Sequence, residues 1–258
     1  MKNMVECLFV TIGMFTKIPT PQIEWNKKNM RYVFVFFPFI GIIIGVLEYL
    51  WFLIYQNNSI DKLLYSIVAA ILPVIITGGI HVDGFVDSCD AFFSYGNKEK
   101  KIEILSDPNV GAFGVIYLII YFLIVLGCFS QISETEIIWF TFTIPFVMSR
   151  TVGGLMMKLE KSAKSSGLMV VFKNSDEKDK TILFLFVWLV LVLLSAGYLS
   201  YRYMIFCIIG IVLFVVIFRR YAYRNIGGFT GDLIGFSVTV TEVICLVAIA
   251  TGGIFDWF

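Results

Sequence analysis

The residues best suited to chemistry in this chain of 258 residues lie together in one polar stretch, residues 78–114, inside an otherwise apolar sequence. This stretch holds the only histidine, His81, and three closely spaced aspartates. The i, i+4, i+7 spacing of Asp83, Asp87 and Asp90 places their side chains on one face of a helix. Clustered carboxylates repel one another unless a cation lies among them, which predicts a divalent metal, and Mg²⁺ in turn indicates a phosphate-bearing substrate. We therefore predict that the three aspartates bind Mg²⁺ and that they form, with His81, the catalytic group.

Two simpler interpretations of this stretch stay open. An exposed helix with solvated charges accounts for acidic residues in general, but not for three of them interleaved with Val82, Phe85 and Phe92 directly after a Gly-Gly pair. His81 suits a general base, a hydrogen-bond donor to phosphate, or a residue that only begins the helix.

A second polar group follows within the same stretch. Lys100, Glu103 and Asp107 are spaced i, i+3, i+7, which again places them on one helical face. Pro108 ends this helix, so that Asp107 can fold back toward the first acidic helix, and we predict Asp107 as a fourth metal ligand. Lys100 would bind phosphate and Glu103 would support the ligands, although an i, i+3 ion pair between these two is the plain structural alternative.

A single arginine, Arg150, lies within a predicted apolar span. A charge there is costly and usually faces the protein interior or a ligand. Because a guanidinium suits phosphate bidentately, we predict Arg150 as a phosphate-binding residue. The alternative is that its side chain reaches from the inner end of the span to the membrane surface.

A glycine-rich segment, GGFTGD at residues 227–232, leads into the last apolar span. Backbone N–H groups that run into the first turn of a helix form a natural phosphate site. We predict phosphate binding by this loop and metal binding by Asp232, while Thr230 as a plain helix cap is the alternative. The predicted phosphate-binding residues are Gly227, Gly228, Thr230 and Gly231.

Glu242 lies on the same helical face as Asp232. Asp232, Gly235, Thr239 and Glu242 fall within an arc of roughly 80° at about 100° per residue. An acid within the membrane is a functional hypothesis by default. We therefore predict that Glu242 supports the metal ligands.

The composition indicates a membrane protein. Hydrophobic residues make up 59% of the chain and charged residues 15%, with a mean hydropathy of +0.87, whereas a soluble domain is about 45–50% apolar and about 25% charged. The five cysteines are scattered without a CxxC pair, which argues against a disulfide framework or a zinc site. Neither a cleavable signal peptide nor a second soluble domain is indicated, so we expect one transmembrane catalytic domain over residues 1–258.

Seven apolar stretches are predicted to span the membrane, so the expected fold is an all-α polytopic integral membrane protein. A shorter apolar stretch at residues 4–15 cannot cross about 30 Å of hydrocarbon, and we expect an interfacial or re-entrant helix there. The acidic stretch adds a helical segment in the cytoplasm. The predicted spans are residues 32–55, 63–77, 111–130, 137–157, 181–199, 203–218 and 233–251.

The distribution of basic residues predicts the orientation. Of the 20 lysines and arginines, 17 lie before the first span or after the second, fourth and sixth. Basic loops stay in the cytoplasm, so we expect the N-terminus and the acidic stretch inside, the C-terminus outside, and a location in the cytoplasmic (inner) membrane. The basic loop at residues 158–180 has this topological role, and it would also attract a polyanionic substrate.

Taken together, the motifs resemble those of the cobalamin synthase family, the adenosylcobinamide-GDP ribazoletransferases. GGIHVDGFVDSCDAFF is similar to the family signature Gly-Gly-apolar-His-apolar-Asp-Gly followed by two aspartates. The resemblance covers nearly the whole chain in order. The other matching segments are Thr16-Lys17-Ile18-Pro19, Phe37-Pro38 with Gly41 and Gly45, Glu103-Ile104, Asp107, GAFG, Ser149-Arg150, Gly167-Leu168, and GGFTGD with Gly235 and Glu242.

Four residues at three places in the chain depart from the family pattern. Lys100 stands where the family often has arginine, and Pro108-Asn109 replaces a Ser-Arg-like pair. Thr239 replaces an acidic residue that is common on the polar face of the last span. The departures concern the roles of Asn109 and Thr239.

The resemblance implies a reaction and its partners. α-Ribazole or its 5′-phosphate attacks the phosphorus nearest the cobinamide in adenosylcobinamide-GDP, GMP leaves, and adenosylcobalamin or its phosphate forms. The family is Mg²⁺-dependent and works in the lipid bilayer at the last assembly step of the corrinoid. No nucleic-acid partner is expected, and a homo-oligomer is left open.

Other classes of protein remain as alternatives. The DG…D…D pattern is also similar to part of the motif of CDP-alcohol phosphotransferases, which likewise displace a nucleoside monophosphate with an alcohol. A cation-coupled transporter would hold its site near the bilayer midplane, whereas most acidic residues here lie toward the predicted cytoplasmic edge. A non-catalytic scaffold leaves the acidic helical faces unexplained.

Overall fold

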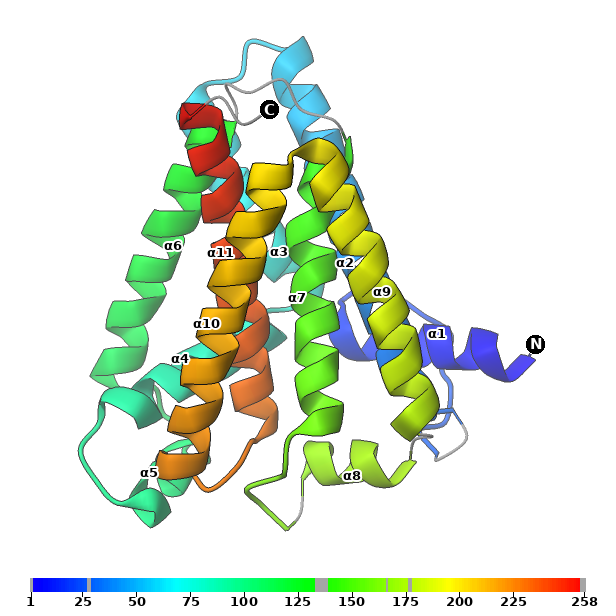
Figure 1. The fold of residues 1–258 in the computed structure, drawn as a ribbon, viewed down its shortest axis with the longest axis vertical. Helices are drawn as coiled ribbons and strands as arrows, with labels where there is room; N and C mark the ends of the chain where they lie inside the picture. Colours follow the sequence, from blue (N-terminus) through cyan, green and yellow to red (C-terminus); the bar gives the residue numbers. More distant parts are fainter. Residues whose placement is uncertain (1, 27–28, 133–138, 166, 176–177, 256–258) are drawn as a thin grey trace.

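The fold is a bundle of helices (Figure 1). The computed structural model describes all residues except 1, 27–28, 133–138, 166, 176–177 and 256–258, and every regular element in the described part is a helix. The helices are α1 (Lys2–Phe15), α2 (Val33–Asn57), α3 (Lys62–Thr77), α4 (Ile80–Phe93), α5 (Lys98–Ile104), α6 (Ala112–Ile132), α7 (Trp139–Leu159), α8 (Leu168–Ser175), α9 (Lys178–Leu199), α10 (Tyr201–Asn225) and α11 (Gly231–Ile254).

The described residues contain five or six helices that are long and apolar enough to cross a membrane, whereas the sequence predicts seven spans. In the described part of the chain, α2, α6, α9, α10 and α11 are long and apolar enough to cross a membrane, and the bent pair α3–α4 makes a sixth if it counts as one span. The all-α membrane fold is confirmed, but the count of seven is not. The fourth predicted span begins at residue 137, outside the described residues, and its remainder forms α7, which packs against α2, α9 and α11.

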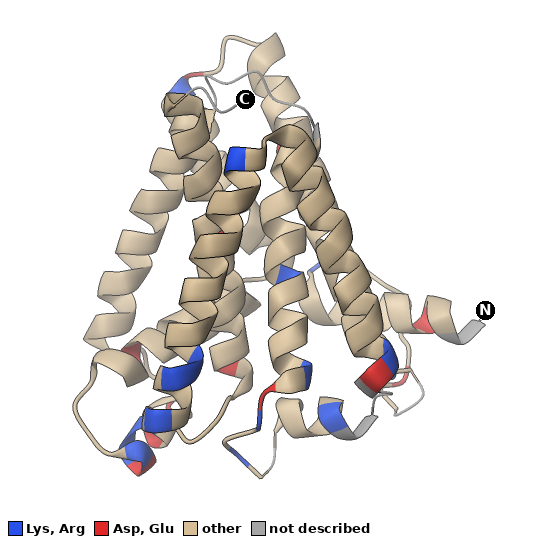
Figure 2. Ribbon diagram, in the orientation of Figure 1, with Lys and Arg blue, Asp and Glu red and all other residues tan. Residues whose placement is uncertain are grey.

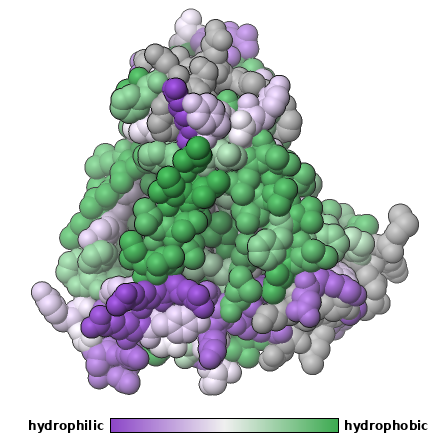
Figure 3. All heavy atoms as spheres, in the orientation of Figure 1, coloured by the Kyte–Doolittle hydropathy of each residue, from purple (hydrophilic) through white to green (hydrophobic). Residues whose placement is uncertain are grey.

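Charged residues gather at one end of the bundle, which we call the charged end. Lys, Arg, Asp and Glu are concentrated where α4, α5, α8 and the last turns of α10 lie (Figure 2). Above this end, the face formed by α9 and α10 is apolar (Figure 3). Side chains such as Leu194 and Val216 are more than 60% exposed there, as expected for a surface that faces lipid.

A sharp bend brings α4 to the charged end. Gly78 and Gly79 adopt φ values of +64° and +78°, a left-handed conformation that a residue with a side chain rarely adopts. α3 therefore stops at Thr77, and α4 leaves it at an angle of 97°. Lys17 packs its aliphatic chain on Gly78, where a Cβ atom would overlap it. As a result, α4 lies across the bundle instead of continuing along a span.

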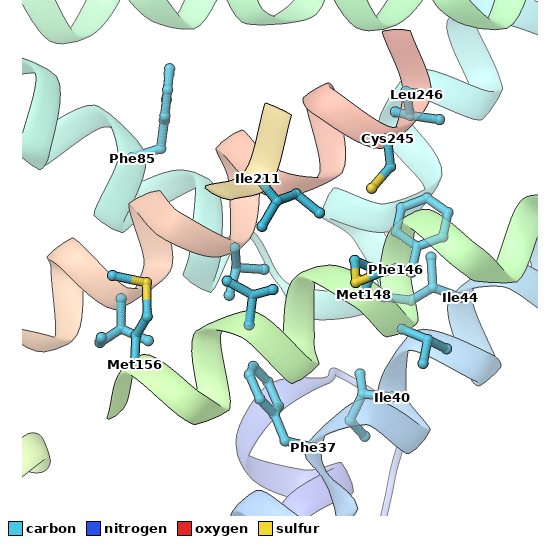
Figure 4. Packing of buried hydrophobic residues seen from close by; sticks show 14 of the residues in the cluster. Phe37, Ile40, Ile44, Phe85, Phe146, Met148, Met156, Ile211, Cys245 and Leu246 are labelled. Atoms are coloured by element: carbon cyan, nitrogen blue, oxygen red, sulfur yellow. The ribbon is translucent and has the colours of Figure 1, made fainter. Parts of the chain in front are cut away.

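Two small residues allow α2 and α7 to pack closely. Gly41 and Gly45 form a GxxxG motif on α2, and a side chain at either would collide with the backbone of α7 at Phe146 or Thr143. Such motifs let membrane helices approach at backbone distance. Apolar side chains from both helices fill the space around this contact, as Phe37, Ile40 and Ile44 of α2 do with Phe146 and Met148 of α7 (Figure 4).

A second close contact joins α4 to α11. A Cβ atom on Gly84 would lie 2.8 Å from the carbonyl oxygen of Asp232, and one on Gly235 would lie 3.2 Å from the carbonyl oxygen of His81. The Thr239 hydroxyl donates a hydrogen bond of 3.2 Å to that same His81 carbonyl. Because the two backbones touch, the first turn of α11 lies beside the acidic face of α4.

Candidate active site

Four carboxylates, which we call the acidic cluster, meet at the charged end. α4 carries Asp83, Asp87 and Asp90, and the first turn of α11 carries Asp232. Along α4 the aspartates pass from exposed (Asp83) through half-buried (Asp87) to buried (Asp90). The predicted helix and its acidic face are therefore present, and the contact between Gly84 and Asp232 adds the fourth carboxylate.

Asp87 is the electrostatic centre of this cluster. Partial burial, followed by the negative charges of Asp83, Asp232 and Asp90, raises the pKa of Asp87 to about 6. Each neighbouring carboxylate disfavours a further negative charge at the same place. The cluster is consequently a region of negative potential that attracts cations.

Asp90 has a structural partner that the sequence did not reveal. Its carboxylate accepts hydrogen bonds from the backbone N–H groups of Gly111 at 2.7 Å and Gly114 at 2.9 Å. These groups lie at the start of α6, where four N–H groups lack partners within the helix. A Cβ atom on either glycine would lie 2.5 Å from an Asp90 oxygen. Asp90 therefore holds the first turn of α6, and the GAFG segment leaves room for its carboxylate.

The acidic cluster offers the oxygen ligands that Mg²⁺ prefers, but it does not supply a complete set of protein ligands. In the described part of the chain, no group of three or more His, Cys, Asp or Glu side chains is close enough together to hold a metal ion. Mg²⁺ prefers oxygen ligands, keeps several waters, and is commonly bound by one or two carboxylates together with substrate phosphates. Asp83, Asp87 and Asp232 present only hard oxygen atoms, and their mutual repulsion favours a cation between them, so these residues fit Mg²⁺ bound jointly with a phosphate.

His81 points away from the acidic cluster. It precedes Asp83 by two residues, or about 200° around the helix. The side chain is 7% exposed, and its ring centroid lies 5.6 Å from that of Phe37 and 6.1 Å from that of Phe15. Neither ring nitrogen has a hydrogen-bond partner among the described residues. The structure thus does not bring His81 together with the three aspartates.

Arg150 and Glu242 form a buried ion pair inside the bundle. Arg150 lies near the middle of α7 and is 1% exposed, so its side chain does not reach the membrane surface. The guanidinium donates to Glu242 and, at 3.0 Å, to the hydroxyl of Ser149. Arg150 is thus engaged by Glu242, and we call Ser149, Arg150, Glu242 and the nearby Glu48 the interior cluster.

The residues predicted around α5 lie on the surface. Lys100 and Glu103 form an exposed ion pair of 3.0 Å. This is the alternative to phosphate binding that the sequence left open. Asp107 accepts hydrogen bonds from the backbone and side chain of Asn109 at 2.9 and 2.8 Å. These bonds, with a smaller effect of Lys100, lower the pKa of Asp107. Asn109, one of the departures from the family pattern, thus shapes the turn that holds Asp107.

The GGFTGD loop is held by its own backbone contacts. The N–H of Gly227 donates to Ala222 at 3.0 Å and that of Phe229 to Lys161 at 2.8 Å, while Gly228 packs on the backbone of residues 161–163. Thr230 caps α11 by accepting from the N–H of Leu233 at 3.3 Å, so the cap expected as an alternative is present. Its hydroxyl also contacts a carboxylate oxygen of Asp232 at 3.2 Å, which orients that carboxylate.

Two lysines near the site were not singled out from the sequence. Lys164, in the basic loop, donates to Ser106 at 2.8 Å and lies close enough for its charge to act on Asp232. Lys17 lies over Gly78, in the bend between α3 and α4. The lysine-rich basic loop indicates that some lysine of this loop lies near the site. Only the fold shows that this lysine is Lys164.

Comparison with known proteins agrees with these motifs. Residues 7–250 match the family described as cobalamin-5-phosphate synthase. The chain is 35% identical over 246 residues to a protein of Lachnoclostridium phytofermentans named adenosylcobinamide-GDP ribazoletransferase, covering 94% of this chain and 92% of that one. Proteins of the same name from Clostridium botulinum (34%; 95% and 97% covered) and Listeria monocytogenes (33%; 94% and 96% covered) are similar. No solved structure matches significantly.

Proposed function

Because this chain belongs to the cobalamin-5-phosphate synthase family, we propose that it catalyses the last assembly step of cobalamin biosynthesis. It transfers the adenosylcobinamide-phosphate moiety of adenosylcobinamide-GDP to α-ribazole or its 5′-phosphate. The attacking hydroxyl forms a new P–O bond at the phosphorus nearest the cobinamide, and the bond to GMP breaks. The products are GMP and adenosylcobalamin or its phosphate.

The observation that carries this proposal is the acidic cluster at the charged end. A diphosphate substrate brings several negative charges, and a lone group of carboxylates would repel it. Mg²⁺ held by one or two of Asp83, Asp87 and Asp232 together with the substrate phosphates would neutralise the pyrophosphate and the charge that develops on departing GMP. Asp90 contributes indirectly, because its hydrogen bonds to Gly111 and Gly114 fix the start of α6 against α4.

Other side chains of the protein would bind the phosphate oxygens and accept the proton of the attacking hydroxyl. Lys164, whose charge acts on Asp232, and Lys17, which lies against Gly78 at the bend before α4, are suited to bind phosphate oxygens. An aspartate of the cluster, instead of His81, accepts the proton of the attacking hydroxyl, since His81 is buried among aromatic rings on another side of α4. Arg150 is not assigned to substrate, because Glu242 already balances its charge.

The orientation follows from the same charges. We propose that the charged end faces the cytoplasm, where nucleotides are available, with the N-terminus inside and the C-terminus outside. The bend at Gly78-Gly79 would then hold α4 near the cytoplasmic surface of the bilayer. A hydrophilic thiol reagent should label a cysteine introduced at Asn97, the residue that caps α5, only from the cytoplasmic side. Labelling from outside would reverse the assignment.

Purified protein in lipid nanodiscs tests the activity directly. Incubation with adenosylcobinamide-GDP, α-ribazole 5′-phosphate and Mg²⁺ is expected to release GMP and form a cobalamin, and EDTA is expected to stop both. Asp87→Asn should lower turnover at least a hundredfold, because about 3 kcal/mol of transition-state stabilisation is lost. The matched control is Asp179→Asn, an exposed aspartate at the start of α9, which should leave turnover unchanged.

The nearest alternative activity is that of a CDP-alcohol phosphotransferase. Offering CDP-diacylglycerol and an alcohol in place of the corrinoid substrate separates the two, because that reaction releases CMP. CMP release without GMP release from adenosylcobinamide-GDP would refute the proposed reaction. Wild-type turnover by Asp87→Asn would refute the proposed role of the acidic cluster while leaving the reaction itself intact.

A further inference from the structure

Glu48 is a buried acid that the proposed reaction does not use. It lies on α2, one turn beyond Gly45 of the GxxxG motif, and its exposed fraction is 0%. Neither carboxylate oxygen has a hydrogen-bond partner among the described residues. An ionised carboxylate in such a place would lose its hydration and gain nothing in return.

The surroundings of Glu48 contain too few positive charges. Glu242 of α11 is close enough for the two carboxyl groups to repel each other, and Tyr65 of α3, whose hydroxyl also lacks a partner in the described part, is close to Glu48. Tyr121 of α6 is close enough to Glu48, Glu242 and Arg150 for their charges to act on it. The other helices packed against α2, α1 and α9, place no buried charged side chain there in the described part of the chain.

The charges in this interior cluster do not sum to zero if both acids are ionised. Arg150 supplies one positive charge, and its direct ion pair with Glu242 already neutralises that charge. Glu48 would then carry a net negative charge in an apolar interior, where an unpaired charge is far more costly than a neutral acid.

We propose that Glu48 is a proton-binding site: within the folded bundle its carboxyl group is protonated and neutral at neutral pH. The bound proton leaves the Arg150–Glu242 pair as the only ionised groups of the interior cluster, with charges that cancel. The neutral acid also gains a donor, its O–H, that an ionised carboxylate lacks. Unfolding exposes Glu48 to water and releases the proton at neutral pH.

Infrared difference spectroscopy on the protein in nanodiscs tests the proton directly, because it needs no reagent to reach the buried group. The spectrum of wild type minus Glu48→Gln at neutral pH should contain the C=O stretch of a protonated carboxyl, which shifts in D₂O. The paired bands of an ionised carboxylate in its place would overturn the proposal. The measurement is made in sodium chloride and in choline chloride, and carboxylate bands that appear only with sodium would show a sodium ion in place of the proton.

Thermal unfolding of two matched variants gives an independent readout. Glu48→Gln replaces a neutral acid by a neutral amide of the same shape and should change Tm by less than about 4 °C. Glu242→Gln leaves Arg150 charged and unpaired in the interior and should lower Tm by roughly 6–12 °C. Because the folded protein holds this proton and the unfolded chain releases it, the Tm of wild type should fall more steeply than that of Glu48→Gln as the pH rises from about 5 through neutrality. Equal losses in Tm for the two variants would overturn the proposal.

Discussion

The acidic cluster and the interior cluster both gather carboxyl groups, but they differ in how the charges of those groups are balanced. At the charged end, Asp83, Asp87 and Asp232 repel one another and no arginine or lysine pairs directly with them in the described structure. In the interior, Glu242 has Arg150 as a fixed partner. A charge that is already balanced maintains structure, whereas an unbalanced group is available to a ligand. The difference explains why we assign chemistry to the first cluster and stability to the second.

The strongest test of this contrast is the loss of Arg150. Arg150→Met leaves Glu242 buried without its charged partner, and we expect the free energy of unfolding to fall by about 3–5 kcal/mol. Thermal unfolding and size-exclusion chromatography in detergent measure this loss. The double variant Arg150→Met with Glu242→Leu should recover most of the stability, because a well-packed apolar pair replaces both charges. If Arg150→Met instead keeps its Tm and loses turnover, Arg150 acts on the substrate and the contrast fails.

The opposite pattern is expected at the acidic cluster. Asp83→Asn should reduce turnover by roughly a hundredfold and raise the Mg²⁺ concentration needed for half-maximal activity. Its Tm should stay the same or rise, because one of the repelling carboxylates is removed. Steady-state assays across a magnesium titration, paired with thermal unfolding, give both quantities. A large fall in Tm would mean that this cluster, too, is mainly structural.

The contact between α4 and α11 links stability to activity. In Gly84→Ala the new methyl group would lie 2.8 Å from the Asp232 carbonyl, and we expect a loss of about 1–3 kcal/mol in stability together with weaker magnesium binding. Gly127→Ala on α6 is the matched control, since nothing lies within 4 Å of the added carbon. The control should be neutral or slightly stabilising, because alanine favours a helix more than glycine does.

The smallest effect is expected at the cap of α11. Thr230→Ala removes the bond from the N–H of Leu233 and the contact with Asp232, and it should cost about 1 kcal/mol in stability. Ser195→Ala, on the exposed face of α9, removes a hydroxyl that bonds only within its own helix and should leave Tm unchanged. If Thr230→Ala affects turnover far more than Tm, the loop contributes to phosphate binding as the sequence suggests.

Local patterns in the sequence were sufficient to predict the long apolar helices and the acidic face of α4, but not α8, which lies in the stretch interpreted as a basic loop. The three aspartates lie on one helix because their spacing matches its period, and the stop at Gly78-Gly79 follows from two residues that tolerate positive φ. The bend of 97° was not predicted, because a glycine pair permits a change of direction without specifying its angle.

Such local patterns do not predict contacts between residues that are distant in the chain. Asp90 was interpreted as a metal ligand, and its bonds to Gly111 and Gly114 depend on how α6 packs on α4. Arg150 was interpreted as a phosphate ligand near the end of a span, but its partner follows 92 residues later. Both residues are charged and lie in apolar surroundings, so the sequence indicates that they need partners without identifying them.

The separation between Arg150 and Glu242 has a consequence for how the protein is made. A ribosome adding about 5–20 residues per second needs roughly 5–20 s to pass from Arg150 to its partner 92 residues later. During that interval α7 enters the membrane with an arginine whose counter-charge has not been synthesised. The nascent helix must therefore be held in a wet or protein-lined environment, and the bundle can close its interior only when the last helix arrives.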